Sequence, residues 1–379
     1  DAAHRAELAE SWPAADLVVT SYDLLRRDEA LYEGQEFYAC ILDEAQAIKN
    51  HTTQKYKAVC KVRSRVRFAL TGTPVENRLG ELWSIFSFLM PGYLPPYKSF
   101  CSRFEKPIVQ EEDQTAVRRL NQLTGPFILR RMKSDVLKEL PPKTENVYRI
   151  ELEEEQRKLY LAAVVDAREK LQAAKPEDKM AVFAVLMRLR EICCDPRLIA
   201  DNWEGGSAKL DACVELVSSA VEGGHRILLF SQFTSMLELL AKRLDAEGIS
   251  HFTLQGSTPK PVRAELVRRF NGGEVSVFLI SLRAGGTGLN LTAADIVIHY
   301  DPWWNVAAQN QATDRAYRIG QQNPVQVYKL IAQDTIEEKI VELQQAKQSL
   351  ADTVTGTADG AILSMRPDEL LQLLEGSEP

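Results

Sequence analysis

The chain has 379 residues, 45% of them hydrophobic and 26% charged, and carries a net charge of −7 at pH 7. This composition excludes a chain that is disordered throughout and a collagen-like fibre, and no stretch approaches the roughly 18 consecutive apolar residues of a membrane span. The negative charge argues against a general polyanion-binding surface but leaves room for a local one. Six cysteines without CxxC spacing predict free thiols in a reducing, cytoplasmic setting, and the length predicts two or three domains.

Three short runs in the first third are predicted to be strands: Asp16–Tyr22, Phe37–Glu44 and Arg65–Gly72. Because each run is almost continuously apolar, we expect a parallel sheet that is buried on both faces. Residues 79–140 are predicted to be helical and irregular, and Pro141-Pro142 marks a boundary.

Two helices and a linker are predicted in the middle of the chain. Residues 151–174 have the pattern of a charged helix, and residues 179–192 that of a strongly apolar one. The Gly-Gly-Ser segment at 205–207 is predicted to be a linker that leads into the last part of the chain.

Strands and helices alternate regularly in the last third, which predicts a parallel α/β sheet. The predicted strands are Arg226–Phe230, Phe252–Leu254, Val275–Ser281, Ile296–Tyr300 and Val325–Ile331. Thr258 and Pro259 are expected to open a helix, with Thr258 as its N-cap. Its expected apolar face consists of Val262, Leu266, Val267 and Phe270.

A further helix is expected to open at the capping box Thr335–Glu338. Its expected buried stripe consists of Ile336, Ile340, Leu343 and Leu350. A short amphipathic helix within 363–375 is expected to pack on this second α/β unit.

The first chemical signal is a pair of carboxylates, Asp43 and Glu44, at the end of a predicted strand. One carboxylate can position Mg²⁺ beside substrate phosphates, and the other can polarise an attacking water. Strand-terminal acids are also common as plain polar strand ends. The hydroxyls and glycine of Thr71-Gly72-Thr73 close the next predicted strand, at the edge where open α/β sheets bind ligands, and this favours the functional alternative.

A second signal is a pair of arginines, Arg315 and Arg318, which would share one face of a helix. Two guanidinium groups on one face can grip phosphate oxygens and stabilise charge on a transferring phosphoryl group. The alternative is a pair of surface arginines beside Asp314.

The next signals are a glycine-rich turn and paired tryptophans. Gly285, Gly286 and Gly288 follow a predicted strand and permit close approach of a phosphate or ribose. Trp303 and Trp304 are either a small satellite core or a stacking platform for nucleobases.

Charge is also segregated locally. The basic residues gather between Arg118 and Lys143, and an acidic run follows at 151–155. The basic stretch is a candidate phosphate-binding surface, and the alternative is two solvated faces of opposite charge.

In this order, these segments resemble the SNF2 family of ATP-dependent DNA translocases, within helicase superfamily 2. The segments that carry the resemblance are ILDEAQAIKN, ALTGTPVENRLGELWSIFSFLMPGYL, LLFSQFTSMLELL, LQGSTPKPVRAELVRRFN, LISLRAGGTGLNLTAADIVIHYDPWWN and QATDRAYRIGQ. RRMKSDVLKELPPKTE and TIEEKIVELQQAKQSL resemble the family's basic connector and closing brace helix. The resemblance runs from about Asp16 to Leu350.

The resemblance implies two RecA-like parallel-sheet lobes with helical insertions, ATP and Mg²⁺ in the cleft between them, and double-stranded DNA across both. Residues 1–78 would be the carboxyl-terminal part of an incomplete first lobe. Residues 79–204 would hold the helical insertions and the basic connector, and residues 205–379 the second lobe with brace helix and tail.

The resemblance also implies roles for single residues. Asp43 would hold the metal, Glu44 would activate water, and Arg315 and Arg318 would be paired arginine fingers. Those expected near the nucleotide are Gly286, Gly288 and Gln311, and those expected to couple ATP state to DNA grip are Thr71, Gly72 and Thr73. Those expected to contact DNA are Thr20, Ser21, Gly256, Ser257, Thr258, Arg283 and Trp304.

Four features depart from the family pattern. Gln46, Val306 and Tyr317 replace the usual His, Pro and His, and the DEAQ form resembles the prokaryotic branch. The sequence contains no GxxxxGK[ST] loop, whose backbone amides and lysine would cradle the β- and γ-phosphates. In this family the loop lies upstream of the segment at Asp16–Tyr22. We therefore expect a truncated chain that starts partway through the first lobe and by itself hydrolyses ATP negligibly.

The sequence thus predicts the motor portion of a DNA translocase that remodels protein–DNA complexes, as a monomer in the prokaryotic cytoplasm, associated with the nucleoid. Its expected partners are double-stranded DNA and a DNA-bound protein as remodelling target. The alternative is a fragment that binds DNA or a partner without hydrolysing ATP. A strand-separating helicase is a third alternative.

Overall fold

The structure is a computed structural model. It describes residues 2–72, 79–111, 113–129, 131, 137, 139–175, 178–200, 202–285, 288–344, 367, 370, 371 and 374. Thr73, Gly286 and Leu350, which the sequence analysis singled out, lie outside the described residues. The described residues form two compact units, one up to Leu129 and one from residue 131 onward.

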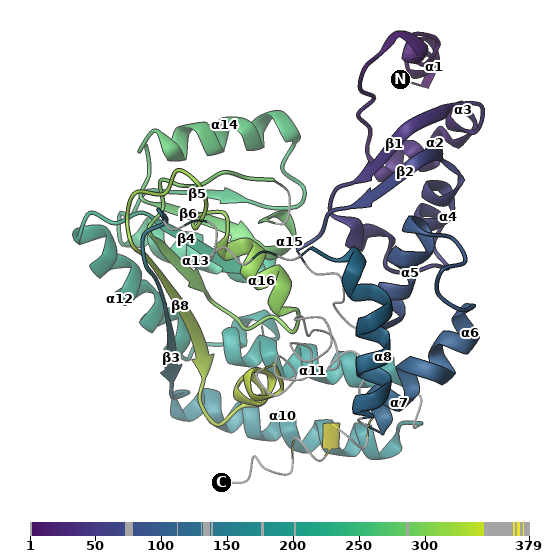
Figure 1. The fold of residues 1–379 in the computed structure, drawn as a ribbon. Coiled ribbons are helices and arrows are strands. Elements are labelled where there is room, and N and C mark those ends of the chain that lie inside the picture. Colours follow the sequence, from purple (N-terminus) through teal and green to yellow (C-terminus); the bar gives the residue numbers. More distant parts are fainter. Residues whose placement is uncertain are drawn as a thin grey trace. The chain divides into compact units, whose positions relative to one another are not determined.

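The first unit is built around two parallel strands, β1 (Glu36–Leu42) and β2 (Arg63–Ala69), in which Leu42 pairs with Ala69. Helices α2 (Tyr22–Arg27), α3 (Glu29–Glu33) and α4 (Gln54–Lys61) pack on the sheet. Figure 1 shows α2, α3 and α4 beside the two strands. Their shared core consists of Leu25, Tyr32, Leu42, Ala45, Ile48, Ala58, Val59, Val62 and Phe88.

The predicted strands at 37–44 and 65–72 are therefore confirmed, with small shifts of their ends. Their predicted burial on both faces is wrong for the described residues, because Tyr38, Ile41 and Phe68 are more than half exposed at 75%, 59% and 51%. The prediction of a strand at Asp16–Tyr22 is also wrong. This segment has no ladder partner among the described residues, and without one its backbone cannot form a strand.

The rest of the first unit is helical, as the sequence predicts for residues 79–140. At the N-terminus lie α1 (Ala2–Glu10) and η1 (Trp12–Ala14), and the short η2 (Ala45–Ile48) follows β1, with Ala45 and Ile48 in the shared core. A second group comprises α5 (Leu79–Leu89), α6 (Tyr97–Phe100), the π-helical turn η3 (Cys101–Glu105), α7 (Lys106–Gln110), α8 (Gln114–Thr124) and η4 (Gly125–Phe127). Leu82, Phe86, Phe100 and Leu120 form the core of this group.

The second unit contains a six-stranded parallel sheet in the order β3-β8-β7-β4-β6-β5. Its strands are β3 (Lys143–Ile150), β4 (Ile227–Ser231), β5 (His251–Leu254), β6 (Val277–Ser281), β7 (Ile296–His299) and β8 (Val325–Ala332). All five predicted strands of the last third are present, and β3 joins them at one edge. The predicted parallel α/β sheet of the last third is therefore confirmed, and its central strands are buried throughout.

Helices cover both faces of this sheet (Figure 1). Helices α12 (Ala208–Glu222) and α13 (Thr234–Ala246) pack on the face that holds Ile227 and Leu229. Helices α14 (Lys260–Asn271) and α16 (Val306–Thr313) contribute to the core on the face that holds Leu228 and Phe230. A short helix, α15 (Leu282–Gly285), follows β6 directly.

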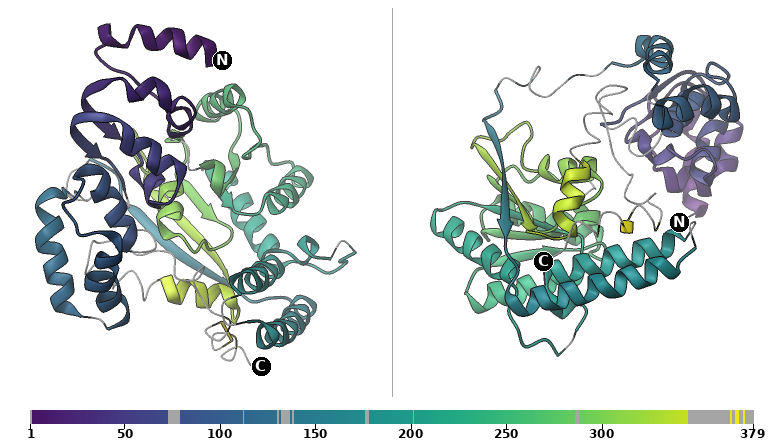
Figure 2. Two further views of the ribbon diagram at one scale, coloured as in Figure 1. Left: turned by 90° about the vertical axis from the view of Figure 1, so that its right-hand side faces the viewer. Right: turned by 90° about the horizontal axis from the view of Figure 1, so that it is seen from below.

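A third core in the second unit lies between two long helices, α10 (Glu154–Ala173) and α11 (Lys179–Cys194), which appear side by side in Figure 2. Ile336 and Ile340 of the helix at 336–344 pack into it, as do Leu370 and Leu374 of the tail. The expected packing of the tail on this unit is thus confirmed for its described residues. A short helical turn, η5 (Pro196–Leu198), follows α11.

Two predicted helix starts differ in detail. Thr258 is not the N-cap of α14, because its hydroxyl accepts from the Gln255 N–H at 3.1 Å and Pro259 takes the cap position. Val262 is 46% exposed and does not belong to the buried face of that helix. At the helix of residues 336–344, Glu338 accepts from the N–H of Asp334 rather than from Thr335.

Across the described residues, no helix combines the length and apolarity that a membrane crossing would require.

Candidate functional site

In the first unit, the candidate catalytic residues lie at the carboxyl ends of β1 and β2. Asp43 and Glu44 directly follow β1 and are both exposed. Glu44 has a left-handed backbone (φ 50°), unusual for a residue other than glycine and held here because the next residue, Ala45, donates its N–H to the Leu70 carbonyl at 2.9 Å. Strained backbone of this kind clusters at functional sites, and here it falls on Glu44, the predicted water-activating residue.

A chain of side-chain hydrogen bonds joins the two strand ends. The Gln46 amide donates to the Glu44 carboxylate at 2.6 Å, and the Thr71 hydroxyl donates to the Gln46 carbonyl oxygen at 2.7 Å. Thr71 is one of the predicted coupling residues, and Gly72 follows it. The sequence analysis noted Gln46 only as a departure from the family pattern and gave it no role. The signal that could have revealed its role is its place two residues after Glu44, on the same strand end.

The carboxylates suit a hard cation. Among the described residues, no lysine or arginine forms an ion pair with Asp43 or Glu44, and one oxygen of Asp43 accepts only the Glu44 N–H at 3.0 Å. Tyr22 donates to the backbone carbonyl of Asp43 at 2.8 Å, and burial, with a smaller contribution from Asp43, raises the pKa of Tyr22 to about 12. Exposed carboxylate oxygens with free acceptor capacity are the ligands that Mg²⁺ prefers. The described residues contain no cluster of three or more ligating side chains, so such an ion would need other ligands such as water and phosphate.

In the second unit, a cavity of about 570 Å³ lies at the carboxyl ends of β4, β5, β6 and β7, and we call it the strand-end cavity. Its walls come from four strand ends and from α11. The lining residues are Phe183, Met187, Gln232, Phe233, Thr234, Gln255, Gly256, Ser257, Ser281, Trp303 and Trp304. None of these is charged, so polar contacts in the cavity come from amides, hydroxyls and backbone groups. Two predicted DNA contacts, Gly256 and Ser257, meet a third, Trp304, in this cavity.

Arg263 holds the loop at 255–258 by hydrogen bonds to its backbone. Its guanidinium donates to the carbonyls of Thr258 at 2.8 Å, of Gly256 at 2.9 Å and of Gln255 at 3.3 Å. Within the loop, the Gln255 N–H is bonded to the Thr258 hydroxyl and the Thr258 N–H to the Gln255 carbonyl, so Gly256 and Ser257 are the loop residues whose polar groups can face a ligand. Arg263 was not among the predicted site residues, because its effect acts through backbone carbonyls that a sequence does not reveal.

The paired tryptophans differ in burial. Trp304 is 5% exposed and belongs to the core shared by α10 and α11, whereas Trp303 is half-buried. Both line the strand-end cavity, with their rings 5.4 Å apart. Each of the two alternatives, a small core and a stacking platform, thus agrees with part of the structure. Trp304 is packed in a core, and both tryptophans also line the cavity.

The two candidate arginines do not share a helix, so that part of the prediction is wrong. Helix α16 ends at Thr313, and Arg315 and Arg318 lie in tight turns after it. The Arg315 carbonyl accepts the N–H of Leu291, a residue of another segment, at 3.0 Å. Arg318 also donates to the Leu289 carbonyl, at 3.3 Å. Both arginines therefore contact the segment after the glycine-rich turn, where Gly288 has a positive φ of 45°.

The remaining predicted residues are placed as follows. Ser21 caps α2, since its hydroxyl accepts from the Leu24 N–H at 3.3 Å, and Thr20 precedes it on an exposed segment. Gln311 lies in the last turn of α16, half-buried. Arg283 lies in α15, and its side chain is outside the described part of the structure.

The described residues of the basic stretch lie in both units. Arg118 and Arg119 are exposed on α8, and Lys143 begins β3, where its ammonium contacts the Glu145 carboxylate at 2.6 Å.

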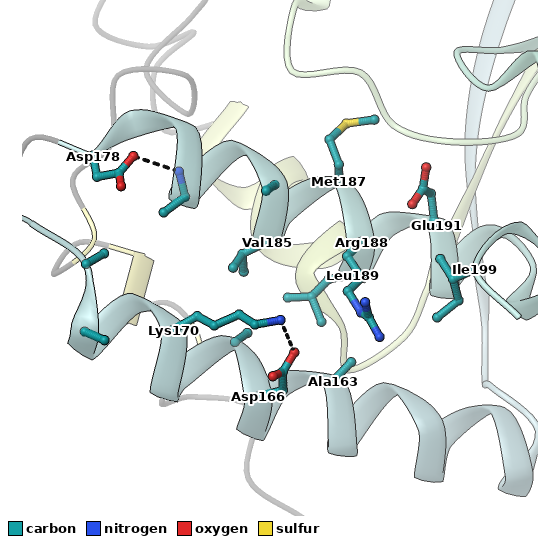
Figure 3. A pocket seen from close by; sticks show the side chains of 15 residues that line it. Ala163, Asp166, Lys170, Asp178, Val185, Met187, Arg188, Leu189, Glu191 and Ile199 are labelled. Carbon is teal, nitrogen blue, oxygen red and sulfur yellow. Dashed lines mark hydrogen bonds and ion pairs between the residues drawn. The ribbon is translucent and has the colours of Figure 1, made fainter.

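A second cavity, of about 720 Å³, lies between α10 and α11 (Figure 3). Figure 3 shows the side chains of Lys170 and Asp166 on the same helix, α10, pointing toward each other along one wall of the cavity. Their charged groups form an ion pair at 2.7 Å. None of the predicted site residues lines this cavity.

Comparison with protein families matches two domain models in succession. Residues 5–198 match the SNF2-related domain, and residues 208–320 match the helicase conserved C-terminal domain. Together the two matches cover most of the chain.

Similar full-length relatives are much longer than this chain. The chain is 40% identical over 365 residues to a protein of Mycoplasma pneumoniae named uncharacterized ATP-dependent helicase, covering 95% of this chain and 35% of the relative. It is 39% identical to the putative ATP-dependent helicase/translocase YwqA of Bacillus subtilis, covering 97% of this chain and 41% of the relative. The chain thus spans about a third to two fifths of these relatives.

Two solved structures share the fold. The Sulfolobus solfataricus SWI2/SNF2 ATPase core in complex with dsDNA is 34% identical, with a TM-score of 0.52 over 94% of this chain and 76% of that one. The same core solved as a domain is 35% identical, with a TM-score of 0.54 over 96% and 75%.

Proposed function

The chain belongs to the SNF2 family of ATPase cores, with RecA-like parallel-sheet units and helicase-like domains, and from this premise we propose that it is the motor portion of an ATP-dependent translocase on double-stranded DNA. The observation that carries the proposal is the hydrogen-bonded chain Glu44–Gln46–Thr71, because it joins a candidate water-activating carboxylate to a candidate coupling residue. We also propose the division into residues 1–78, 79–204 and 205–379.

In the first unit, Asp43 would hold Mg²⁺, which when bound neutralises phosphate charge and orients the phosphates. Glu44 would accept a hydrogen bond from the attacking water and orient it. Gln46 holds one Glu44 oxygen by its amide and so fixes the carboxylate's direction. Because Thr71 donates to the other end of the same amide, a displacement of Thr71 would reorient Glu44.

In the second unit, Arg315 and Arg318 would supply the positive charge that stabilises the transferring phosphoryl group. Their anchoring to Leu289 and Leu291 ties them to the turn at Gly288, a position expected near the nucleotide. Gln311 and Gly286 would complete this side of the nucleotide site.

The strand-end cavity would contact one DNA strand through Gly256, Ser257 and the tryptophan pair. Hydroxyl and backbone N–H groups of this lining would contact phosphate or sugar oxygens, and such contacts do not read base sequence. Phosphate contacts by lysines and arginines elsewhere, including Arg118 and Arg119, would supply most of the affinity. Thr20, Ser21, Thr258 and Arg283 are further proposed DNA contacts. The proposed partners are duplex DNA and a DNA-bound protein that the motor displaces; we also propose a monomer in the prokaryotic cytoplasm, associated with the nucleoid.

The second candidate function is a DNA- or partner-binding segment that hydrolyses no ATP. The absence of GxxxxGK[ST] from the sequence favours it for this chain by itself. Two assays on the chain separate the candidates. The first is fluorescence anisotropy with labelled duplexes of unrelated sequence at several salt concentrations, and the second is steady-state ATP turnover with saturating duplex.

We expect duplex binding that is similar between sequences and that weakens steeply with salt, together with negligible turnover by this chain alone. DNA-stimulated turnover on the order of 1 s⁻¹ would contradict the second expectation. Absence of duplex binding at low salt would contradict the proposed function itself.

A further inference from the structure

One arginine of the helical region, Arg190, packs against residues that line the strand-end cavity but does not line the cavity itself. Arg190 lies on the same face of α11 as Phe183 and Met187, which line the cavity, and it is 0% exposed. Its Nη2 lies 3.2 Å from Oδ2 of Asp301 and donates to the Pro302 carbonyl at 2.5 Å. Arg190 thus contacts the segment that leads directly into Trp303 and Trp304.

Asp301 extends this contact to a second wall of the cavity. Its Oδ1 accepts from the Ser231 hydroxyl at 2.6 Å and from the Gln232 N–H at 3.2 Å. Ser231 in turn accepts the N–H of Phe233 at 3.2 Å. One buried ion pair therefore joins α11, the end of β4 and the segment after β7.

The guanidinium also lies against the aromatic walls. Its Cζ is 4.3 Å from the centroid of the Trp304 ring and 5.5 Å from that of Phe233. Within the described part of the chain, its Nε and Nη1 have no hydrogen-bond acceptor, and the cation–π contact with Trp304 adds to the ion pair with Asp301. The contact fixes where the indole can lie.

Stability does not account for this arrangement. A buried ion pair contributes little over well-packed apolar residues of the same volume, because desolvation offsets the attraction. The buried Nε and Nη1, which have no hydrogen-bond acceptor among the described residues, increase that cost. An arrangement of this kind is better explained by the geometry that it imposes on neighbouring groups.

We propose that Arg190 is a positioning residue of the strand-end cavity, which holds Trp304 by direct contact and Gln232 through Asp301 and so makes DNA affinity depend on α11. The inference rests on the proposed function of the cavity as a contact for one DNA strand. It assigns to the helical region a part in DNA binding without direct contact with DNA.

The chain offers a matched control. Lys209 and Glu337 form a second ion pair in the same unit, both 0% exposed, and neither lines the cavity. Arg190→Met and Lys209→Met each remove one buried charge and leave a carboxylate unpaired. Both substitutions should lower the melting temperature. A difference between the two variants in duplex affinity or in the tryptophan signals therefore isolates the role of the cavity. Arg190→Lys keeps the charge but not the planar fork.

The experiment uses the 379-residue chain labelled with 5-fluorotryptophan, with the signals of Trp303 and Trp304 assigned through Trp→Phe variants. Fluorine NMR and duplex anisotropy are measured at a temperature where thermal melts show each variant folded. We expect Arg190→Met to shift or broaden the signals of Trp303 and Trp304 and to weaken duplex binding about tenfold, within the range of one base–aromatic contact. The duplex affinity of Arg190→Lys should lie between that of Arg190→Met and that of the parent. Lys209→Met should bind duplex within about twofold of the parent.

Two results would overturn the positioning role: unmoved Trp303 and Trp304 signals in Arg190→Met, or an equal loss of affinity in Lys209→Met. A parent chain that binds no duplex would overturn the proposed function and the affinity part of the inference. The fluorine signals are read without DNA, so they still decide separately whether Arg190 positions Trp304.

Discussion

Replacement of Trp304 by alanine should destabilise the second unit far more than a surface substitution would. The indole is 5% exposed and packs against Arg190 and against Phe183, whose ring lies 6.1 Å away. A tryptophan buries about 150–250 Å², and at about 25 cal/mol per Å² this corresponds to about 4–6 kcal/mol of apolar burial. Measured Trp→Ala substitutions in cores cost about 3–5 kcal/mol, so we expect a loss in that range.

For a unit of this size, each kcal/mol lowers the melting temperature by about 2–4 °C, so the expected fall is roughly 6–20 °C. Circular dichroism melts of the parent, Trp304→Ala and Trp303→Ala measure it. Trp303 is only half-buried, so its alanine variant should melt closer to the parent while still weakening duplex binding. A Trp304→Ala variant that melts within about 2 °C of the parent would refute the assignment of Trp304 to the core.

Three further predictions concern named side chains. In a version of the protein extended by a GxxxxGK[ST] segment, Gln46→Ala should lower DNA-stimulated ATP turnover about tenfold or more with little change in nucleotide affinity, because Glu44 loses its orienting amide; equal turnover would argue against the Glu44–Gln46–Thr71 chain. In the same version, Arg315→Ala or Arg318→Ala should lower turnover by about 10³–10⁵ while sparing ATP binding, and turnover within about threefold of the parent would contradict the finger assignment. Burial, with help from Lys329 and Lys143 and against Glu145, lowers the pKa of His299 to about 3. The unfolded chain binds this proton near pH 6.5. The contribution of neutral His299 to the free energy of unfolding is therefore fully present above that pH and is lost as the pH falls toward 3, by about 1.4 kcal/mol per pH unit. In urea melts at a series of pH values, His299→Gln should lose stability less steeply in acid than the parent, and an equally steep loss would contradict the lowered pKa.

Much of the fold follows from apolar pattern alone. The strands of the second unit were predicted within one or two residues, because continuous β-branched runs bounded by polar segments have few alternatives in a parallel sheet. Asp16–Tyr22 has the same composition but no partner strand among the described residues. Pairing is a property of the neighbours, which a local pattern cannot report.

The candidate site was predicted correctly where it depends on strand ends and wrongly where it depends on contacts between distant segments. Asp43, Glu44 and Thr71 are found together because carboxyl ends of adjacent parallel strands meet at one edge. Arg315 and Arg318 were predicted to share a helix that in fact ends at Thr313, and a local pattern could not show the contact between Arg315 and the distant Leu291. Arg263 and Arg190 act through backbone carbonyls and other segments, so their spacing in the sequence gave no signal, whereas the place of Gln46 two residues after Glu44 did offer one.

ATP turnover as a function of duplex length tests the central proposal most directly, in the version extended by a GxxxxGK[ST] segment. A motor that tracks along DNA should turn over more ATP on longer duplexes at equal concentration of ends, until dissociation limits each run, and Glu44→Gln should abolish the signal while duplex binding persists. Turnover that is independent of duplex length and of Glu44 would contradict the account.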